Sequence, residues 1–149
     1  MAYIADASLL RPGSIVRVEH PLSSSGRPTY PHDFIVVLIP RPLQVGSRIP
    51  LVGVSKIIDP STADPAKHVE MKWLNRRGGD PDTGFTIRCH ACMDFKHVLD
   101  VYRGTQYPLE VKAEFNRRFI RADRLQTVVA TLNAWTRKVQ SERERPPDK

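Results

Sequence analysis

The stretch FTIRCHACMDF, residues 85–95, decides the fold and contains both cysteines of the chain, Cys89 and Cys92. From residue 85 to residue 92 the side chains alternate with the two-residue period of a β-strand that has one buried face. One face would be uniformly apolar, with Phe85, Ile87, Cys89 and Ala91. The other would carry Thr86, Arg88, His90 and Cys92. The pattern predicts a strand with Cys89 in the core, and with Arg88 and His90 side by side on the opposite face.

The same alternation bears on metal and redox chemistry at the CHAC sequence. A structural zinc site normally has four ligands, so the two cysteines would need His90 and His97 as well. Neighbouring residues of a strand point to opposite faces, which separates Cys89 from His90. A thioredoxin-like pair would open a helix, whereas the flanking TIR and MDF are strand-like. The sequence therefore predicts no metal ligands, no redox pair and no cofactor.

Four further apolar segments, bounded by turns rich in Pro, Gly or Ser, predict additional strands. They are GSIVRVEH (13–20), FIVVLIP (34–40), IPLVGVSKII (49–58) and HVEMKW (68–73). The second and third are continuous apolar runs, which indicates burial on both faces. Gly53 indicates a bulge or a close approach of the backbone to a ligand. KHVLDVY (96–102) continues as strand or short helix, so we expect a small barrel over about residues 11–110.

The C-terminal part changes from strand to helix periodicity. A single apolar stripe predicts an amphipathic helix over about residues 123–140. The stripe consists of Leu125, Val128, Val129, Leu132, Trp135 and Val139. Residues 141–149, SERERPPDK, should fray because they are charged and contain Pro-Pro. We therefore predict one domain over residues 1–149, mainly β with a C-terminal helix.

Length and charge narrow the classes of partner. The chain has 149 residues, a formal net charge of +7 and 40% hydrophobic residues. Residues 111–149 hold ten Lys and Arg against five Asp and Glu. Such a balance favours nucleic acid or an acidic peptide as partner, although a basic surface can also serve solubility alone. We expect no membrane contact and a cytoplasmic location, because no apolar run is long enough to span a bilayer and no signal peptide is recognisable.

The order of these segments resembles the MazF, PemK and Kid family of bacterial toxins. GSIVRV resembles the opening motif of the family, FIVVLI its second strand, and IRCH the Arg-Cys-Asp of the Kid and PemK branch. TGF (83–85) and the C-terminal apolar spacing also match, so the likeness covers roughly residues 11–135. It implies an SH3-like barrel endoribonuclease, the toxin component of a type II toxin–antitoxin system. A homodimer and an acidic antitoxin that occupies the RNA groove are further implications.

The resemblance also implies roles for individual residues. Arg88 and His90 match the catalytic acid and base with which the 2′-hydroxyl of single-stranded RNA attacks its own phosphate, without a metal. Ser55 lies where a Thr hydroxyl stabilises the phosphate. The chain departs from the family by carrying His90 in place of Asp, and His32-Asp33 in place of Arg-Pro. We assign RNA-binding roles to Arg27, His32, Arg17 and Lys56. The alternative is a non-catalytic SH3-like barrel that binds nucleic acid or an acidic protein.

Overall fold

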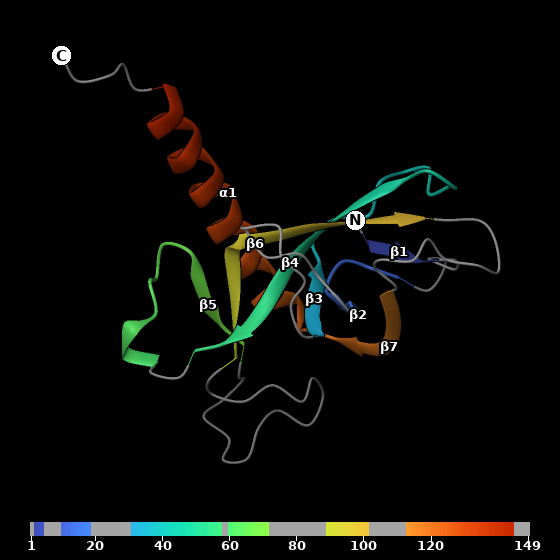
Figure 1. The fold of residues 1–149 in the computed structure, drawn as a ribbon, viewed down its shortest axis with the longest axis horizontal. Helices are drawn as coiled ribbons and strands as arrows, with labels where there is room; N and C mark the ends of the chain where they lie inside the picture. Colours follow the sequence, from blue (N-terminus) through green and yellow to red (C-terminus); the bar gives the residue numbers. More distant parts are fainter. Residues whose placement is uncertain are drawn as a thin grey trace.

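The structure is a computed structural model and describes residues 2–4, 10–18, 31–57, 60–71, 89–101 and 113–144. Within these residues seven strands form one sheet, and a single α-helix follows it (Figure 1). The strands are β1 (Ala2–Ile4), β2 (Ser14–Val18), β3 (His32–Val36), β4 (Arg48–Lys56), β5 (His68–Glu70), β6 (Cys89–Val101) and β7 (Ala113–Phe119). A short 3-10 helix spans Pro60–Thr62, and the helix α1 spans Ala122–Glu144. The prediction of a mainly β chain with a C-terminal helix is confirmed.

The strands follow the order β1-β6-β4-β3-β2-β7, with β5 paired to β6 off this path. Only the pairing of β1 with β6 is parallel among the described strands. The sheet curls, so that β1 and β7 at the two ends of the path come near each other (Figure 1). Both of these strands lie outside the predicted core of residues 11–110. They were not expected, because neither AYI nor AEFNRRF has a clear apolar period.

Two apolar clusters lie on opposite faces of the sheet. The inner face, enclosed by the curl, holds Val16, Val18, Phe34, Val36, Ile49, Leu51, Leu99 and Val101. The helix face, which packs against α1, holds Ile15, Ile35, Val52, Val54, Cys89, Ala91 and Met93. The central strands therefore contribute to both clusters, which confirms burial on both faces for residues 34–36 and 49–54. Cys89 is a core residue, as the alternation predicted.

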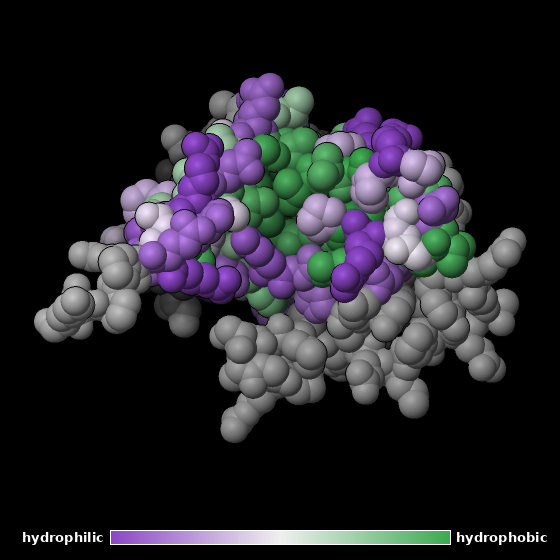
Figure 2. Space-filling view, turned by 90° about the horizontal axis from the view of Figure 1, so that it is seen from above, coloured by the Kyte–Doolittle hydropathy of each residue, from purple (hydrophilic) through white to green (hydrophobic). Residues whose placement is uncertain are grey.

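The predicted strand 34–40 is shorter than expected at its C-terminal end. β3 ends at Val36, and two residues later the Leu38 side chain is 60% exposed. The chain leaves the sheet here to enter the Pro-rich turn that contains the cis Arg41–Pro42 peptide. Figure 2 shows apolar residues visible on the upper face, bounded on both sides by hydrophilic ones. An apolar run thus marked the strand correctly but overstated its length.

A bulge in β6 controls which side chains face inward. Cys92 pairs with Gly53 and Lys96 with Val52, so residues 93–95 have no partner on β4. Before the bulge, odd-numbered residues of β6 lie on the helix face, and after it they lie on the inner face. Figure 1 shows the resulting bend in β6. A bulge was one of the two features predicted from Gly53, and it lies opposite this residue, with the extra residues on β6 and not on β4. It places the even-numbered residues His90 and Cys92 on the inner face.

Helix α1 packs on the sheet through its N-terminal half. Val128 is fully buried, while Leu125, Leu132 and Trp135 pack partly against the helix-face cluster. The helix begins one residue before the predicted start and continues to Glu144. Residues 141–144, for which the sequence predicted fraying, are helical in the structure, and the Gln140 amide donates to the Glu144 carboxylate at 3.2 Å across one turn. In the part of the chain that the structure covers, no helix has the length and apolar character needed to span a membrane.

Candidate functional site

A row of three polar residues crosses β4, β6 and β5 on the inner face. Ser55 and Glu70 are the register partners of His90 on its two sides. His90 is only 5% exposed, Ser55 is half-buried and Glu70 is exposed. Strand pairing thus brings Ser55 and His90, which the sequence predicted to act together, into directly opposed positions. It also adds a carboxylate that the sequence reasoning did not select.

The other predicted site residues do not join this row. Arg88 and Arg27 lie outside the described residues. Arg17 shares the helix-face alternation of Ile15, and its guanidinium lies 3.6 Å from the Asp33 carboxylate. Lys56 is exposed and follows Val52 and Val54 in alternation, so it also belongs to the helix face. Neither Arg17 nor Lys56 therefore shares a face with Ser55 and His90.

His32 and Phe95 mark the boundary between the polar row and the inner apolar cluster. The His32 ring meets the Phe95 ring edge-on at a centroid distance of 5.3 Å. Phe95 also packs against Phe34 at 5.0 Å and lies directly over Gly53. A Cβ at residue 53 would fall 2.2 Å from Phe95 Cδ2, which explains why glycine stands there. The close approach at Gly53 is therefore made by an aromatic ring of the chain, whereas the sequence had predicted a ligand there.

Cys92 forms a second row with Gly53 and His68, its register partners on β4 and β5. The thiol donates to the His90 carbonyl at 3.5 Å and also interacts with Ser55. Burial, reinforced by the nearby Asp94 carboxylate, raises the pKa of Cys92 to about 11. At neutral pH the group is therefore a thiol and not the thiolate that a nucleophilic cysteine requires.

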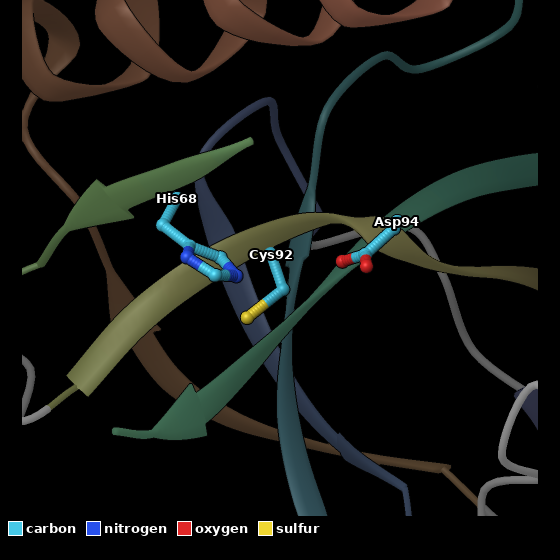
Figure 3. Close-up of side chains that lie close together, drawn as sticks. All are labelled: His68, Cys92 and Asp94. Carbon is cyan, nitrogen blue, oxygen red and sulfur yellow. The ribbon is translucent and has the colours of Figure 1, made fainter. Parts of the chain in front are cut away.

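The His68 imidazole is fixed by the turn that precedes β5. Its Nδ1 accepts a hydrogen bond from the Asp64 amide at 2.8 Å, and the Asp64 carbonyl accepts from the His68 amide at 2.7 Å. The proton of the neutral ring is consequently on Nε2. Burial lowers the pKa of His68, and the Lys67 cation lowers it further. The ring is directed toward Cys92 (Figure 3), so its Nε2 is the nitrogen available on the inner face.

Asp94 completes a cluster with His68 and Cys92. Their ligand atoms all lie within 4.8 Å of one another. The bulge places Asp94 beside Lys67, whose ammonium bonds the Asp94 carboxylate at 3.2 Å. The Lys67 carbonyl in turn accepts from the Met93 amide at 2.8 Å, which fixes the two segments together. Cys89 and His90 are not among these three residues, whereas Cys92, which the sequence also predicted not to bind metal, is one of them.

These three side chains could hold a metal ion after a small rearrangement. Coordination through Nε2 would move the imidazole proton to Nδ1. Nδ1 could then no longer accept the hydrogen bond from the Asp64 backbone N–H, and leaving this N–H without its partner costs ~1–3 kcal/mol. The binding free energy of a structural zinc ion is ~10–16 kcal/mol, which is much larger than this cost. His97 was a candidate fourth ligand in the sequence. Its ring instead packs edge-on against the Phe34 ring, with a centroid distance of 5.5 Å. Burial lowers the pKa of His97 as well.

The sequence contained part of the signal for this cluster. The alternation of HVEMKW set His68 and Glu70 on one face, and that of RCHAC set His90 and Cys92 on one face. What it lacked was the pairing of β5 with β6, which brings the two sets together. Asp94 and Lys67 gave no periodic signal because both lie beside the bulge.

Comparisons of the chain with protein-family models, with curated proteins and with solved structures found no match.

Proposed function

We propose that the chain is a metal-independent endoribonuclease that cleaves single-stranded RNA, with an SH3-like barrel of the MazF and PemK type. The observation that carries the proposal is the row in which His90 lies between Ser55 and Glu70. A histidine flanked by a hydroxyl and a carboxylate has the components of acid–base catalysis on a phosphodiester. The curled, mainly antiparallel sheet with its C-terminal helix is compatible with this family and supports the assignment.

The proposed reaction uses the ribose as its own nucleophile. The His90 imidazole accepts the proton of the 2′-hydroxyl, and the 2′-oxygen attacks the adjacent phosphorus. The bond from phosphorus to the 5′-oxygen breaks, and that oxygen takes a proton from Arg88, the acid implied by the family resemblance. The products are a 2′,3′-cyclic phosphate and a 5′-hydroxyl end. Ser55 donates a hydrogen bond to a non-bridging phosphate oxygen, and Glu70 orients the imidazole.

The proposed biological setting is a toxin–antitoxin pair in the cytoplasm. The net charge of +7 supports RNA as the substrate and an acidic antitoxin as the partner. On this proposal the active form is a homodimer, and its expression without antitoxin inhibits growth. Antitoxin binding should weaken as salt rises, because screening reduces the attraction between opposite charges. Tight binding of a basic protein, indifferent to salt, would contradict a shared groove for RNA and antitoxin.

The test is cleavage of a fluorogenic single-stranded RNA panel in the presence of EDTA. Wild type should release product with a cyclic phosphate end, and His90→Gln should lower kcat by ~10²–10⁴-fold. Arg88→Ala should cause a comparable loss, and Ser55→Ala a smaller one, because it removes a single neutral hydrogen bond. His97→Gln is the matched control, since His97 lies in the same strand beyond the bulge. The proposal fails if wild type cuts no RNA, or if His90→Gln cuts as fast as His97→Gln.

One observation favours a second candidate function. The His90 side chain is only 5% exposed, which limits access of a substrate to its imidazole. The alternative is a barrel without catalytic activity that binds nucleic acid or an acidic protein through its basic surface. RNA binding with a marked salt dependence, but without cleavage, would identify this function. The same RNA panel measured by anisotropy separates the two candidates.

A further inference from the structure

We propose that His68, Cys92 and Asp94 bind one divalent transition-metal ion, with zinc as the best match. The ligands would be His68 Nε2, Cys92 Sγ and a carboxylate oxygen of Asp94. These side chains come from β5, β6 and the β6 bulge, and Figure 3 shows them grouped on one side of the sheet. This inference goes beyond the proposed ribonuclease function, which uses no metal.

The donor set selects the kind of ion. A thiolate is a soft ligand that selects zinc and copper(I), an imidazole suits zinc, copper and iron, and zinc also binds Asp and Glu oxygens. Magnesium and calcium prefer oxygen ligands alone and would gain little from the sulfur. A thiolate and a carboxylate together neutralise a divalent ion. Three protein ligands leave a fourth tetrahedral position for water, as in zinc sites that keep one coordination position open.

Each donor is already positioned by a neighbouring group. The turn that begins at Asp64 fixes the imidazole ring, and Lys67 bonds the Asp94 carboxylate at 3.2 Å. The Cys92 thiol donates to the backbone carbonyl of His90 at 3.5 Å. The Lys67–Asp94 pair can persist with an ion bound and is an outer contact of the kind that orients ligands in metal sites. The Asp64 contact to Nδ1 and the thiol contact to the His90 carbonyl position the donors only in the metal-free protein and break when the ion binds. Lys67 bonds one oxygen of Asp94, so the other oxygen can turn toward an ion.

The geometry requires a modest contraction. In a tetrahedral zinc site with bonds of ~2.0–2.3 Å, neighbouring ligand atoms lie roughly 3.3–3.8 Å apart. The three donors here lie within 4.8 Å of one another. Asp94 has the freedom to move, because its side chain is 44% exposed and it lies in the unpaired bulge. On metal binding, the thiol proton leaves to solvent and the imidazole proton moves from Nε2 to Nδ1. The hydrogen bond from the Asp64 backbone N–H to Nδ1 is then lost.

The test is titration of metal-free protein with zinc against a competing chromophoric chelator, followed by cobalt(II) spectroscopy. Wild type should bind one ion per chain, and its cobalt form should show sulfur-to-cobalt charge transfer with tetrahedral d–d bands. Cys92→Ala should remove the charge transfer. Asp94→Asn should weaken zinc binding more than about 100-fold, beyond the ~10–100-fold typical of outer contacts. Asp94 is exposed, so this variant should fold normally.

Cys89→Ala is the matched control, because Cys89 lies in the same strand but on the helix face. It should retain both the stoichiometry and the charge-transfer band. Absence of stoichiometric zinc binding by the wild type overturns the proposal. So does an equal loss of charge transfer in Cys89→Ala and Cys92→Ala, or full affinity in Asp94→Asn. RNA cleavage is measured separately in EDTA, so failure of the metal site and failure of the ribonuclease proposal are distinguishable.

Discussion

Substitution of Gly53 by alanine tests the packing that separates the polar rows from the inner apolar cluster. A Cβ built at Gly53 would lie 2.2 Å from Phe95 Cδ2, 2.7 Å from Cγ and 2.8 Å from Cε2. Contact between carbon atoms is favourable at ~3.5–4.0 Å, so the ring must retreat by roughly 1.3–1.8 Å. Rotation of the ring edge alone does not suffice, because Cγ is also too close. Phe95 must therefore leave its contacts with Phe34 and His32.

The expected loss of stability for Gly53→Ala is about 2–3 kcal/mol. Overpacking of a filled site typically costs ~1–3 kcal/mol, and removal of a whole buried Phe side chain ~3–5 kcal/mol. Phe95 is only partly buried, so the second range sets an upper limit. Alanine is otherwise better than glycine in a strand by ~0.5–1 kcal/mol. Without the Phe95 ring, the same substitution should therefore be neutral or slightly stabilising.

The assay is urea denaturation of wild type, Gly53→Ala, Phe95→Ala and the double variant. A double-mutant cycle should give a coupling of about 2–4 kcal/mol between the two positions, the loss with the Phe95 ring plus any gain without it. Gly46→Ala is the control, because Gly46 has a φ of +90° but nothing within 4 Å of an added Cβ. Its cost of ~1–2 kcal/mol comes from backbone conformation and should not depend on Phe95. The reasoning is refuted if Gly53→Ala costs the same with and without the Phe95 side chain.

Two other predictions concern the core and the buried thiol. Burial raises the pKa of Cys92 from 9.0 to about 11. Between about pH 9 and pH 11 the thiol therefore ionises in the unfolded chain but not in the folded protein. In EDTA, the free energy of unfolding should fall as the pH rises through this range. Cys92→Ala should flatten this fall in pH-dependent urea denaturation, and an unchanged fall would show that burial of the thiol is not its cause. Val128→Ala should cost roughly 2 kcal/mol, because Val128 is fully buried where α1 packs on the sheet. Val139 lies on the same helix but outside the helix-face cluster, so Val139→Ala should cost less than about 0.5 kcal/mol. If the two variants lose equal stability in thermal or urea unfolding, the packing of α1 described above is wrong.

The sequence determined those features that depend on local periodicity. Two-residue alternation placed Cys89 and Ala91 on one face and His90 and Cys92 on the other, because successive side chains of a strand must point to opposite faces. It predicted one buried face, whereas the structure buries both faces at these residues. The apolar stripe located α1 to within one residue at its start. Gly53 predicted either a bulge or a ligand contact, and the structure has a bulge opposite it, on β6. In each case the signal lies within a few residues of the feature that it predicts.

Only the tertiary structure decided which strands pair and in what register. The pairing of β5 with β6 brings His68 beside Cys92 and Glu70 beside His90, although 24 and 20 positions separate these pairs in the chain. The bulge after Cys92 then places Asp94 next to Lys67. Hydrogen bonds between strands join backbone groups that are the same for every residue, so side-chain patterns fix the faces but not the partners. The polar rows of the inner face arise from that choice of partners, which no local pattern contains.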